Sequence, residues 1–327
     1  MLFNLLPMLK KKLVFILVLL PFIGFAQANK LIRQGLRSEN PKEQVELFSN
    51  AIELEPENFD AYFYRGVAKN NLGDFNGAIL DYTKIIIFEP SADVYFNRGN
   101  SKYSLMDFTG AKEDYSKALK LNPDFIEARY SLAVTKNDLE DYKGAIVDLE
   151  AASNINITIP IIMQLARAYS GLKNYSKASE IYNVAVKVVP NEETYYQRGK
   201  FYMSINYYKP ANEDFNAVIN LNKDSMHSYF FRGLSYFFLG KYEEALSDFK
   251  VAVQFDLTDF DAIIGLAATY YKLGDLANSK QNFIKAKSLL MGLNPKQNYT
   301  IDLFKNTYWF EHQYFTFREL YTDLDTL

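Results

Sequence analysis

The chain contains no cysteine among its 327 residues. Disulfides, thiolate metal ligands, a nucleophilic thiol and the lipidated cysteine of a bacterial lipoprotein are therefore excluded. Glycine (15 residues) and proline (10 residues) are scarce, which excludes a collagen-like sequence and favours helix over long disordered segments. Because no covalent cross-link is available, the fold must be stable through packing alone, for which 49% hydrophobic residues are ample.

Concentrated positive charge is also missing. Three of the 36 basic side chains are lysines before position 29, so 33 remain in the rest of the chain, against 39 acidic ones. No run of basic residues follows Lys12, whereas a nucleic-acid-binding domain needs a basic face to neutralise phosphates. We therefore predict no nucleic-acid partner.

Recognisable catalytic motifs are absent as well. The two histidines, His227 and His312, lie far apart and neither belongs to a metal-ligand spacing. The sequence has no nucleophile-elbow, phosphate-loop or zinc-protease motif. We predict that the chain is not an enzyme and uses no cofactor or metal.

One apolar run stands out near the start of the sequence. Lys10, Lys11 and Lys12 precede the apolar run 13–25, and Ala26-Gln27-Ala28 follows it. A positive head, a short apolar stretch and small residues at alternate positions are typical of a secretory signal peptide. We expect residues 1–28 to be removed and the mature chain to be periplasmic or envelope-associated. An uncleaved membrane anchor is the alternative, although the run is short for a bilayer span.

From residue 59 to residue 293 the sequence repeats itself with a period of 33 or 34, which predicts an array of similar structural units. One small residue recurs at Gly66, Gly99, Ala133, Ala166, Gly199, Gly233 and Ala267. A large residue, aromatic in six units, recurs at Tyr82, Tyr115, Leu149, Tyr182, Phe215, Phe249 and Phe283. The steps from Phe75 to Ala78, Tyr82 and Ile85 are 3, 4 and 3, which place these residues on one face of a helix.

Residues 64–90 read YRGVAKNNLGDFNGAILDYTKIIIFEP. The order of small residue, Leu-Gly, aromatic, alanine, aromatic and proline resembles the tetratricopeptide repeat family. The resemblance implies an all-α, right-handed superhelical solenoid of antiparallel helix pairs, with seven units over residues 59–293. A divergent unit is expected over residues 29–58.

Residues 294–327 do not fit the repeat and carry nine aromatic residues, among them the single tryptophan, Trp309. A solenoid exposes the apolar face of its last unit, so a terminal helix commonly covers it. We predict a capping helix here. The alternative is an aromatic surface that binds a partner.

Four units carry arginine directly before the small residue and aspartate sixteen residues later. These pairs are Arg65 and Asp81, Arg98 and Asp114, Arg198 and Asp214, and Arg232 and Asp248. A partly buried guanidinium requires a planar partner, which a carboxylate supplies. We predict structural ion pairs, within a unit or between neighbouring units; a ladder of cations for an anionic ligand is the alternative.

In the proteins that the chain resembles, the first helix of each unit lines a concave groove. The corresponding positions in this sequence are Phe63, Asn70, Phe96, Asn100, Tyr130, Asn137, Tyr196, Lys200 and Phe230. Aromatic residues dominate interface hot spots, and side-chain amides both donate and accept hydrogen bonds. These residues are therefore candidates for binding a partner, and burial of the aromatic rings as ordinary core is the alternative.

The leading functional hypothesis is a non-enzymatic scaffold that binds a peptide or helix of a partner protein in this groove. The partner is expected in envelope or secretion complex assembly, with peripheral membrane association through it. One alternative is a glycan-binding protein of the cell envelope, because aromatic faces also stack on sugars. Another is a structural spacer without a ligand.

Overall fold

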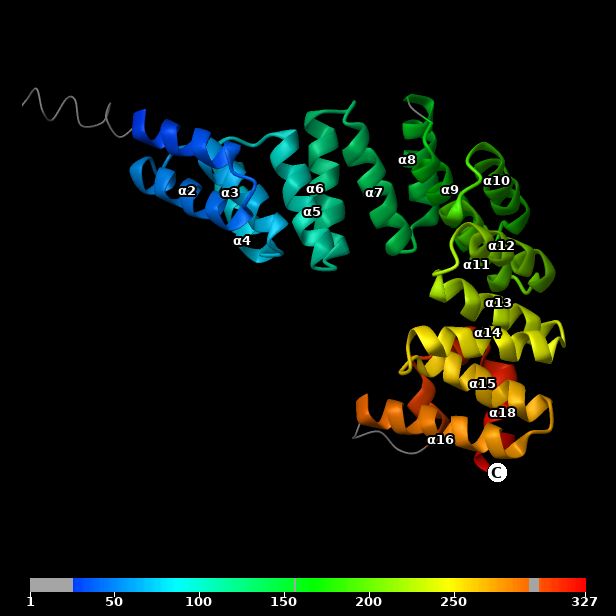
Figure 1. The fold of residues 1–327 in the computed structure, drawn as a ribbon. Coiled ribbons are helices and arrows are strands. Elements are labelled where there is room, and N and C mark those ends of the chain that lie inside the picture. The colour runs from blue at the N-terminus through cyan, green and yellow to red at the C-terminus, as the bar shows by residue number, and fades with distance from the viewer. Residues whose placement is uncertain (1–25, 156, 294–299) are drawn as a thin grey trace, which may run out of the picture. The chain divides into compact units, whose positions relative to one another are not determined.

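The structure is a computed structural model that describes residues 26–155, 157–293 and 300–327. These residues form helices joined by short turns, and no strand occurs among them. The chain divides into two compact units, Met1–Leu172 (unit 1) and Lys173–Leu327 (unit 2). Each unit consists of helices that pack mainly on their neighbours in sequence (Figure 1).

The helices of unit 1 follow the sequence repeat closely. After a helix over residues 26–37 they are α2 (Pro41–Leu54), α3 (Phe59–Asn71), α4 (Phe75–Phe88), α5 (Ala92–Ser104), α6 (Phe108–Leu121), α7 (Ile126–Asp138), α8 (Tyr142–Ile155) and α9 (Ile159–Gly171). Those of unit 2 are α10 (Tyr175–Val188), α11 (Glu192–Ser204), α12 (Tyr208–Leu221), α13 (Met226–Phe238), α14 (Tyr242–Phe255), α15 (Phe260–Lys272) and α16 (Leu276–Leu293). The chain then continues into a C-terminal segment of η1 (Ile301–Phe304), α17 (Tyr308–His312) and α18 (Tyr314–Asp325).

A three-residue turn separates the two helices of each repeat. In the first full repeat Gly73 takes a φ of 78°, and the next residue, Asp74, caps α4 by accepting a hydrogen bond from the backbone N–H of Gly77. A left-handed residue followed by a capping side chain ends one helix and starts the next within a few residues. Within each unit, the two helices of a repeat therefore form an antiparallel hairpin.

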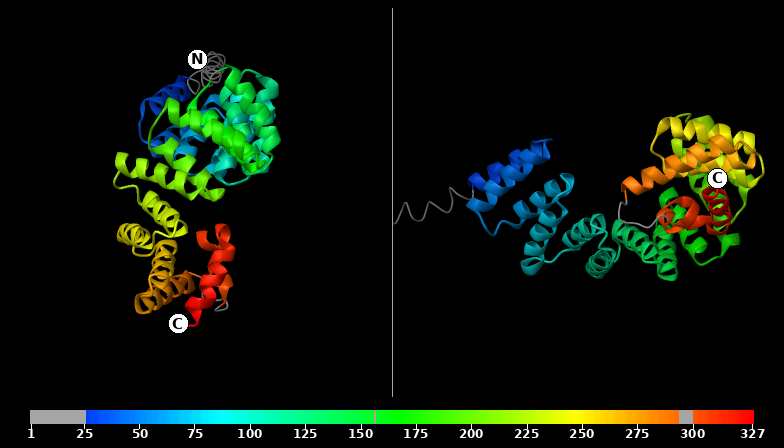
Figure 2. Two further views of the ribbon diagram at one scale, coloured as in Figure 1. Left: turned by 90° about the vertical axis from the view of Figure 1, so that its right-hand side faces the viewer. Right: turned by 90° about the horizontal axis from the view of Figure 1, so that it is seen from below.

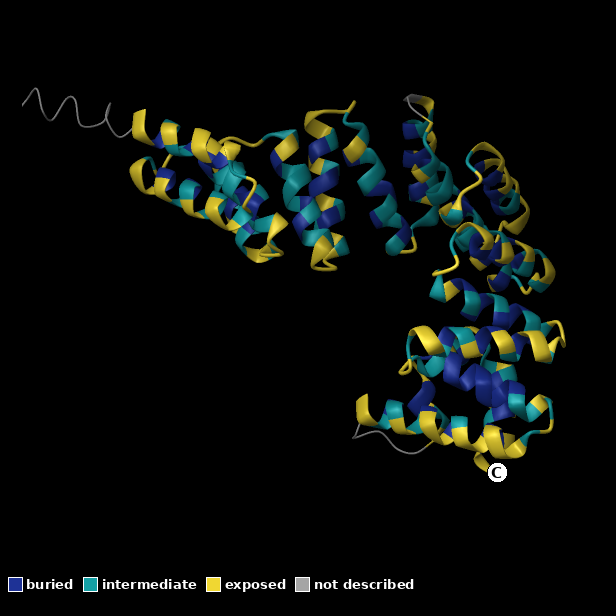
Figure 3. Cartoon of the chain, in the orientation of Figure 1, coloured by how far each residue is buried: buried dark blue, intermediate teal, exposed yellow. Residues whose placement is uncertain are grey.

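Small residues set the distance between the helices of a hairpin. A Cβ atom at Gly99 of α5 would lie 2.7 Å from the ring of Tyr115 of α6. The ring of Tyr115 is buried between Ala111 and Ala118, which are fully buried. The recurrent small and aromatic residues of the sequence thus form the core of the hairpins within each unit. The buried residues follow one side of most helices, whereas α15 is buried all round from Ala262 to Thr269 (Figure 3).

The N-terminal helix over residues 26–37 packs on α2. Ala28 and Ile32 are buried together with Phe48. The predicted cleavage position, after Ala28, falls within this helix, and residues 1–25 of the predicted signal peptide lie outside the described residues. No helix of the described residues is long and apolar enough to span a membrane.

The C-terminal segment covers the last repeat, as the capping prediction requires. Phe304 of η1 stacks on Phe283 of α16, with ring centroids 5.8 Å apart and planes 2° from parallel. Phe317 and Leu320 of α18 are buried, and α18 lies against α15 and α16 (Figure 2). Phe315, by contrast, is 81% exposed.

Candidate partner-binding surface

Each of the four arginines predicted to form ion pairs is joined to its aspartate by two hydrogen bonds. Arg65 and Arg98 donate from Nε and Nη2 to Asp81 and Asp114, respectively, over 2.7–2.9 Å. Arg198 and Arg232 do the same with Asp214 and Asp248 over 2.6–2.9 Å. The aspartate side chains are only 3–6% exposed, so both carboxylate oxygens are satisfied within the fold.

The remaining guanidinium nitrogen, Nη1, reaches the second helix of the preceding repeat. It donates to Ser49, Thr83, Asn183 and Asn216 in the four pairs. In unit 1 a lysine adds a second cation to the carboxylate, with Lys69 on Asp81 and Lys102 on Asp114. Each arginine therefore links three helices and is paired with a carboxylate of its own repeat.

The pairs of unit 2 have no such lysine. Burial raises the pKa of Asp214 and of Asp248 above the ordinary value of 3.8, although the paired arginine opposes this shift.

The third repeat, with Leu132 at the arginine position, uses another cation. Lys136 of α7 donates to Asp148 of α8 over 2.6 Å. The sequence pattern missed this pair, because the lysine lies four residues after the arginine position.

The aromatic residues predicted for the groove differ in how far the fold covers them. Phe63, Phe96, Tyr130 and Tyr196 are half-buried, whereas Phe230 is buried. Their rings contact aromatic rings of the second helices: Phe63 meets Tyr82, Phe96 meets Tyr115 and Tyr196 meets Phe215, with centroids 5.9–6.0 Å apart. These side chains thus contribute to the core with one part of the ring and leave another part open.

Phe230 is covered by a segment distant in sequence. Tyr308 of α17 stands edge-on to the rings of Phe230 and Phe231, at centroid distances of 5.7 and 5.3 Å. The neighbouring Trp309 is fully buried against Phe237 and Phe249 and donates from Nε1 to the backbone oxygen of Asp261. The C-terminal segment therefore occupies the first-helix face of α13 and α15.

The three asparagines predicted to meet a peptide backbone have partners inside the fold. Asn70 accepts a hydrogen bond from Ser101 Oγ, and Asn100 accepts one from the hydroxyl of Tyr115. Asn137 is buried and donates to the backbone and side-chain oxygens of Gln164. An amide has further hydrogen-bonding capacity, so a contact with a partner stays a prediction for Asn70 and Asn100.

Polar contacts also connect the first helices of unit 1 with one another. The hydroxyl of Tyr103 (α5) donates to Asp138 (α7) over 2.6 Å, and Arg167 (α9) donates to the same carboxylate over 2.8 Å. Burial, with the contact to Asp138, raises the pKa of Tyr103 to about 12.

In unit 2, Lys200 is exposed, and its Nζ lies 5.6 Å from the centroid of the Tyr196 ring.

A row of carboxylates accompanies the aromatic positions and was not singled out from the sequence. In four repeats an acidic residue stands three residues before the aromatic one: Asp60 and Phe63, Asp93 and Phe96, Glu127 and Tyr130, and Glu193 and Tyr196. Residues three apart lie on the same face of a helix. These acidic residues recur with the period of the repeat, which is the sequence signal that could have revealed them. The helix dipole also favours an acidic residue in the first turn of a helix, so their presence has an ordinary structural explanation.

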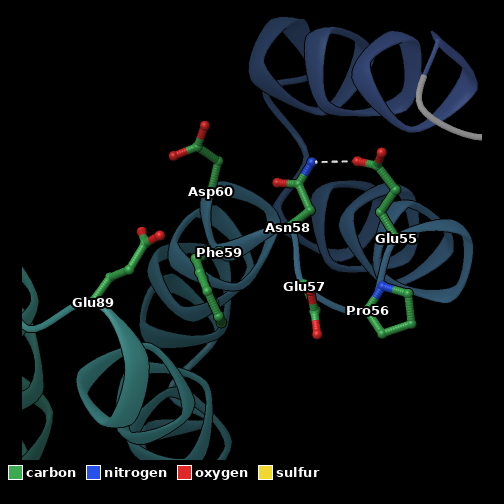
Figure 4. A pocket seen from close by; sticks show the side chains of 7 residues that line it. All are labelled: Glu55, Pro56, Glu57, Asn58, Phe59, Asp60 and Glu89. Atoms are coloured by element: carbon green, nitrogen blue, oxygen red, sulfur yellow. Dashed lines mark hydrogen bonds between the residues drawn. The ribbon is translucent and has the colours of Figure 1, made fainter. Parts of the chain in front are cut away.

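Two of these acidic residues, Asp60 and Glu193, line hollows at the start of first helices. In unit 1 a hollow of about 680 Å³ lies where α2 leads into α3, and Glu55, Glu57, Asp60 and Glu89 surround it. Figure 4 shows Asn58 donating to Glu55 on one side of this hollow. In unit 2 a hollow of about 480 Å³ is lined by Glu192, Glu193 and Tyr196. No group of three or more His, Cys, Asp or Glu side chains in the described part of the chain is arranged to hold a metal ion.

Helical hairpins of equal length, packed in chain order, define a solenoid repeat protein. Tetratricopeptide repeat models match residues 47–79, 92–125, 159–191, 192–225 and 227–259, which together make up just over half of the chain. The chain belongs to the tetratricopeptide repeat family. Repeats of this family indicate a protein–protein interaction scaffold.

Solved structures of this architecture resemble the chain at low sequence identity. A tetratricopeptide repeat protein from Parabacteroides merdae superposes with a TM-score of 0.63 at 20% identity, covering 75% of this chain and 99% of that one. Yeast Tom70 gives a TM-score of 0.56 at 18% identity, covering 92% of this chain and 65% of that one. A chain of the Cut9–Hcn1 hetero-tetramer of the APC/C gives 0.56 at 16% identity, covering 81% and 52%. At identities of 16–20%, these likenesses describe the fold alone. A search of curated proteins by sequence gives no match.

Proposed function

We propose that the chain is a non-enzymatic scaffold that binds a peptide or helix of a partner protein along the first helices of unit 1. The observation that carries this proposal is the repeated pairing of an exposed carboxylate with a partly open aromatic ring. On α3, α5 and α7 the pairs are Asp60 and Phe63, Asp93 and Phe96, and Glu127 and Tyr130.

The two kinds of side chain serve different parts of binding. A ring already fixed by its contact with the second helix offers apolar area without a further loss of side-chain entropy. The carboxylates confer a preference among partners, because a row of negative charge attracts segments rich in lysine or arginine. The proposed ligand of unit 1 is therefore a segment that carries apolar and basic residues.

We also propose that the protein acts outside the cytoplasm, in the assembly of an envelope or secretion complex, and meets the membrane only through its partner. The support is the sequence of the N-terminal segment 1–28, in which three lysines precede an apolar run that ends at Ala26-Gln27-Ala28. Such a sequence is typical of exported proteins.

The test is a comparative pull-down from envelope extract with three purified baits. One is the wild-type protein, and one carries Asp60→Asn, Asp93→Asn and Glu127→Gln, which keep side-chain size and remove the charge. The third carries Glu46→Gln, Glu53→Gln and Glu113→Gln on the exposed surfaces of α2 and α6. All three must show equal helical content and melting by circular dichroism.

We expect a partner that the wild type and the control variant retain equally and that the first-helix variant loses by about tenfold, or roughly 1.4 kcal/mol. Equal recovery with all three baits would exclude the first helices of unit 1 as the binding surface. Equal loss in both variants would show that only the net charge matters.

A further inference from the structure

A cavity of about 810 Å³ lies within unit 2, beside the C-terminal segment. Its walls come from the start of α13, the turn between α14 and α15, the end of α16, and Tyr308 of α17. Pockets that bind small ligands or a few residues of a peptide commonly measure about 300–1,000 Å³. The cavity is therefore large enough for one long side chain and its neighbours.

One wall of the cavity is aromatic. Tyr308 meets Phe230 and Phe231 at interplanar angles of 87° and 83°, so three rings converge at this point. Ring faces carry negative partial charge and attract cations, and they also pack on the methylene groups of a lysine or arginine stem.

Another part of the cavity lining is acidic. Asp256, Asp259 and Asp261 line the cavity, and all three carboxylates accept from backbone donors, Asp256 from the N–H of Thr258 over 2.8 Å. Asp259 accepts from the N–H of Ala262 over 3.0 Å, and Asp261 accepts from the N–H of Tyr308 over 2.9 Å. These carboxylates are held in place before any ligand arrives.

The described residues of unit 2 provide no lysine or arginine for these carboxylates. The ion pairs of that part of the chain involve other acids, namely Glu180, Asp214, Asp248 and Asp325. His227 is the one basic side chain among the residues that line the cavity. A cationic ligand complements such a cavity, whereas an anionic ligand would be repelled.

The smaller hollow of unit 2 adjoins this cavity, because His227 lines both. Glu192 and Glu193 bring two more carboxylates, beside the ring of Tyr196. The combination of aromatic ring and carboxylate therefore occurs twice along neighbouring first helices. An extended segment with two basic residues fits this arrangement better than a single small cation.

We propose that the cavity binds a basic segment of a partner protein, with a lysine or arginine stem against Phe230, Phe231 and Tyr308 and its charged head at Asp259 and Asp261. The inference shares with the proposed function only the premise that the ligand is a protein segment. Because it concerns unit 2, its failure leaves the surface of α3, α5 and α7 untouched. The C-terminal segment acquires a role beyond capping, since it supplies Tyr308 as one wall of the site.

The experiment is isothermal titration of the purified protein with synthetic hexapeptides, at about pH 8, where carboxylates are ionised. The probe alternates leucine and lysine and is acetylated and amidated at its ends. Matched hexapeptides carry glutamine or glutamate in place of lysine. We expect the lysine peptide to bind at least about tenfold more tightly than the glutamine peptide, because a charge-assisted hydrogen bond is about twice as strong as a neutral one. If the wild-type protein binds the lysine and glutamine peptides with equal affinity, the proposal is wrong, and no variant is needed to show it.

Variants then assign the binding to the cavity. Asp259→Asn with Asp261→Asn keeps both oxygen acceptors, including the helix cap, and should weaken the lysine peptide by about tenfold. The control, Glu213→Gln with Asp224→Asn, removes two exposed charges of unit 2 outside the cavity. Tyr308→Leu should also weaken binding, since it removes a ring face. Full affinity in the cavity variants, or an equal loss in the control, would overturn the assignment.

Discussion

Arg98 and Asp114 face each other across the two helices of one repeat, joined by hydrogen bonds of 2.8 Å from Nε and 2.7 Å from Nη2. The third guanidinium nitrogen donates to Thr83 in the preceding repeat, and Lys102 adds a second cation to Asp114. One aspartate is thus the shared counter-charge of two cations in a largely buried place. Its loss should therefore cost more than the loss of an ordinary surface charge.

Asp114→Asn is expected to lower the free energy of unfolding by about 3 kcal/mol, because it leaves two cations partly buried without a counter-charge. Arg98→Leu should cost less, since Lys102 still pairs with Asp114. In the double variant the losses should fall short of additivity by about 0.5–3 kcal/mol. Urea unfolding of the four proteins gives these values, with the exposed Asp124→Asn as the control. Strict additivity would mean that the pair contributes no coupling energy.

The turns between hairpin helices make a second prediction possible. Met106 has a φ of 61°, at the position where Gly73, Gly240 and Gly274 take values of 74–82°. A side chain in this left-handed region costs roughly 1–2 kcal/mol. Met106→Gly should raise the free energy of unfolding by about 0.5–1 kcal/mol, whereas Gly73→Ala should lower it by a similar amount. Chemical denaturation measures both, and a loss of stability in Met106→Gly would contradict this account.

Asp261 should make the stability of unit 2 depend on pH. Burial is the main reason that its pKa rises from 3.8 to about 7; Asp259 and Glu311 add repulsion, and the N–H groups of Tyr308 and Trp309 oppose the rise. Between about pH 4 and pH 7 the folded chain holds a proton that the unfolded chain has lost. Stability from this group therefore falls as the pH rises through that window and changes little above it.

The variant Asp261→Asn isolates this effect, because its amide oxygen still accepts from Tyr308. The wild type should lose on the order of 4 kcal/mol relative to the variant between about pH 4 and pH 8. Calorimetric melting over that range measures the difference. Parallel pH profiles for the two proteins would show that Asp261 titrates at its ordinary pKa.

Trp309 should stabilise unit 2 more than any exposed aromatic residue of the same segment. Its ring is fully buried against Phe237 and Phe249, so Trp309→Ala leaves a large cavity and should cost about 3–5 kcal/mol. Phe315→Ala provides the control, since Phe315 is exposed and its loss should change stability by less than about 0.5 kcal/mol. Similar melting of the two variants would argue against the docking of the C-terminal segment.

The fold was largely predictable from the sequence, because each repeat carries the residues that its own hairpin needs. Gly99 and Tyr115 are only sixteen residues apart, and a local pattern repeated seven times leaves little ambiguity. The Arg–Asp contacts are equally local, with a separation of sixteen residues in all four pairs. Lys136 and Asp148 escaped notice since a different residue of the same helix supplies the cation.

The candidate site was harder to predict, because it depends on contacts that are distant in sequence. Nothing in the repeat indicates that Tyr308 covers Phe230, from which it is separated by more than two full repeats. Asn70 and Asn137 stand at positions that line the groove in relatives, but their hydrogen-bond partners, Ser101 and Gln164, lie in the next repeat. A side chain's surroundings follow from its neighbours in space, which a single repeat does not specify.

The burial of Trp309 has a practical consequence. It is the only tryptophan of the chain, so the tryptophan fluorescence of the protein comes entirely from unit 2. Trp309 lies where the C-terminal segment meets α13 and α15. Helical circular dichroism, in contrast, sums over both units. The unmodified protein therefore has an intrinsic fluorescent probe in unit 2. Recording tryptophan fluorescence and circular dichroism on the same sample distinguishes melting of unit 2 from melting of the whole chain.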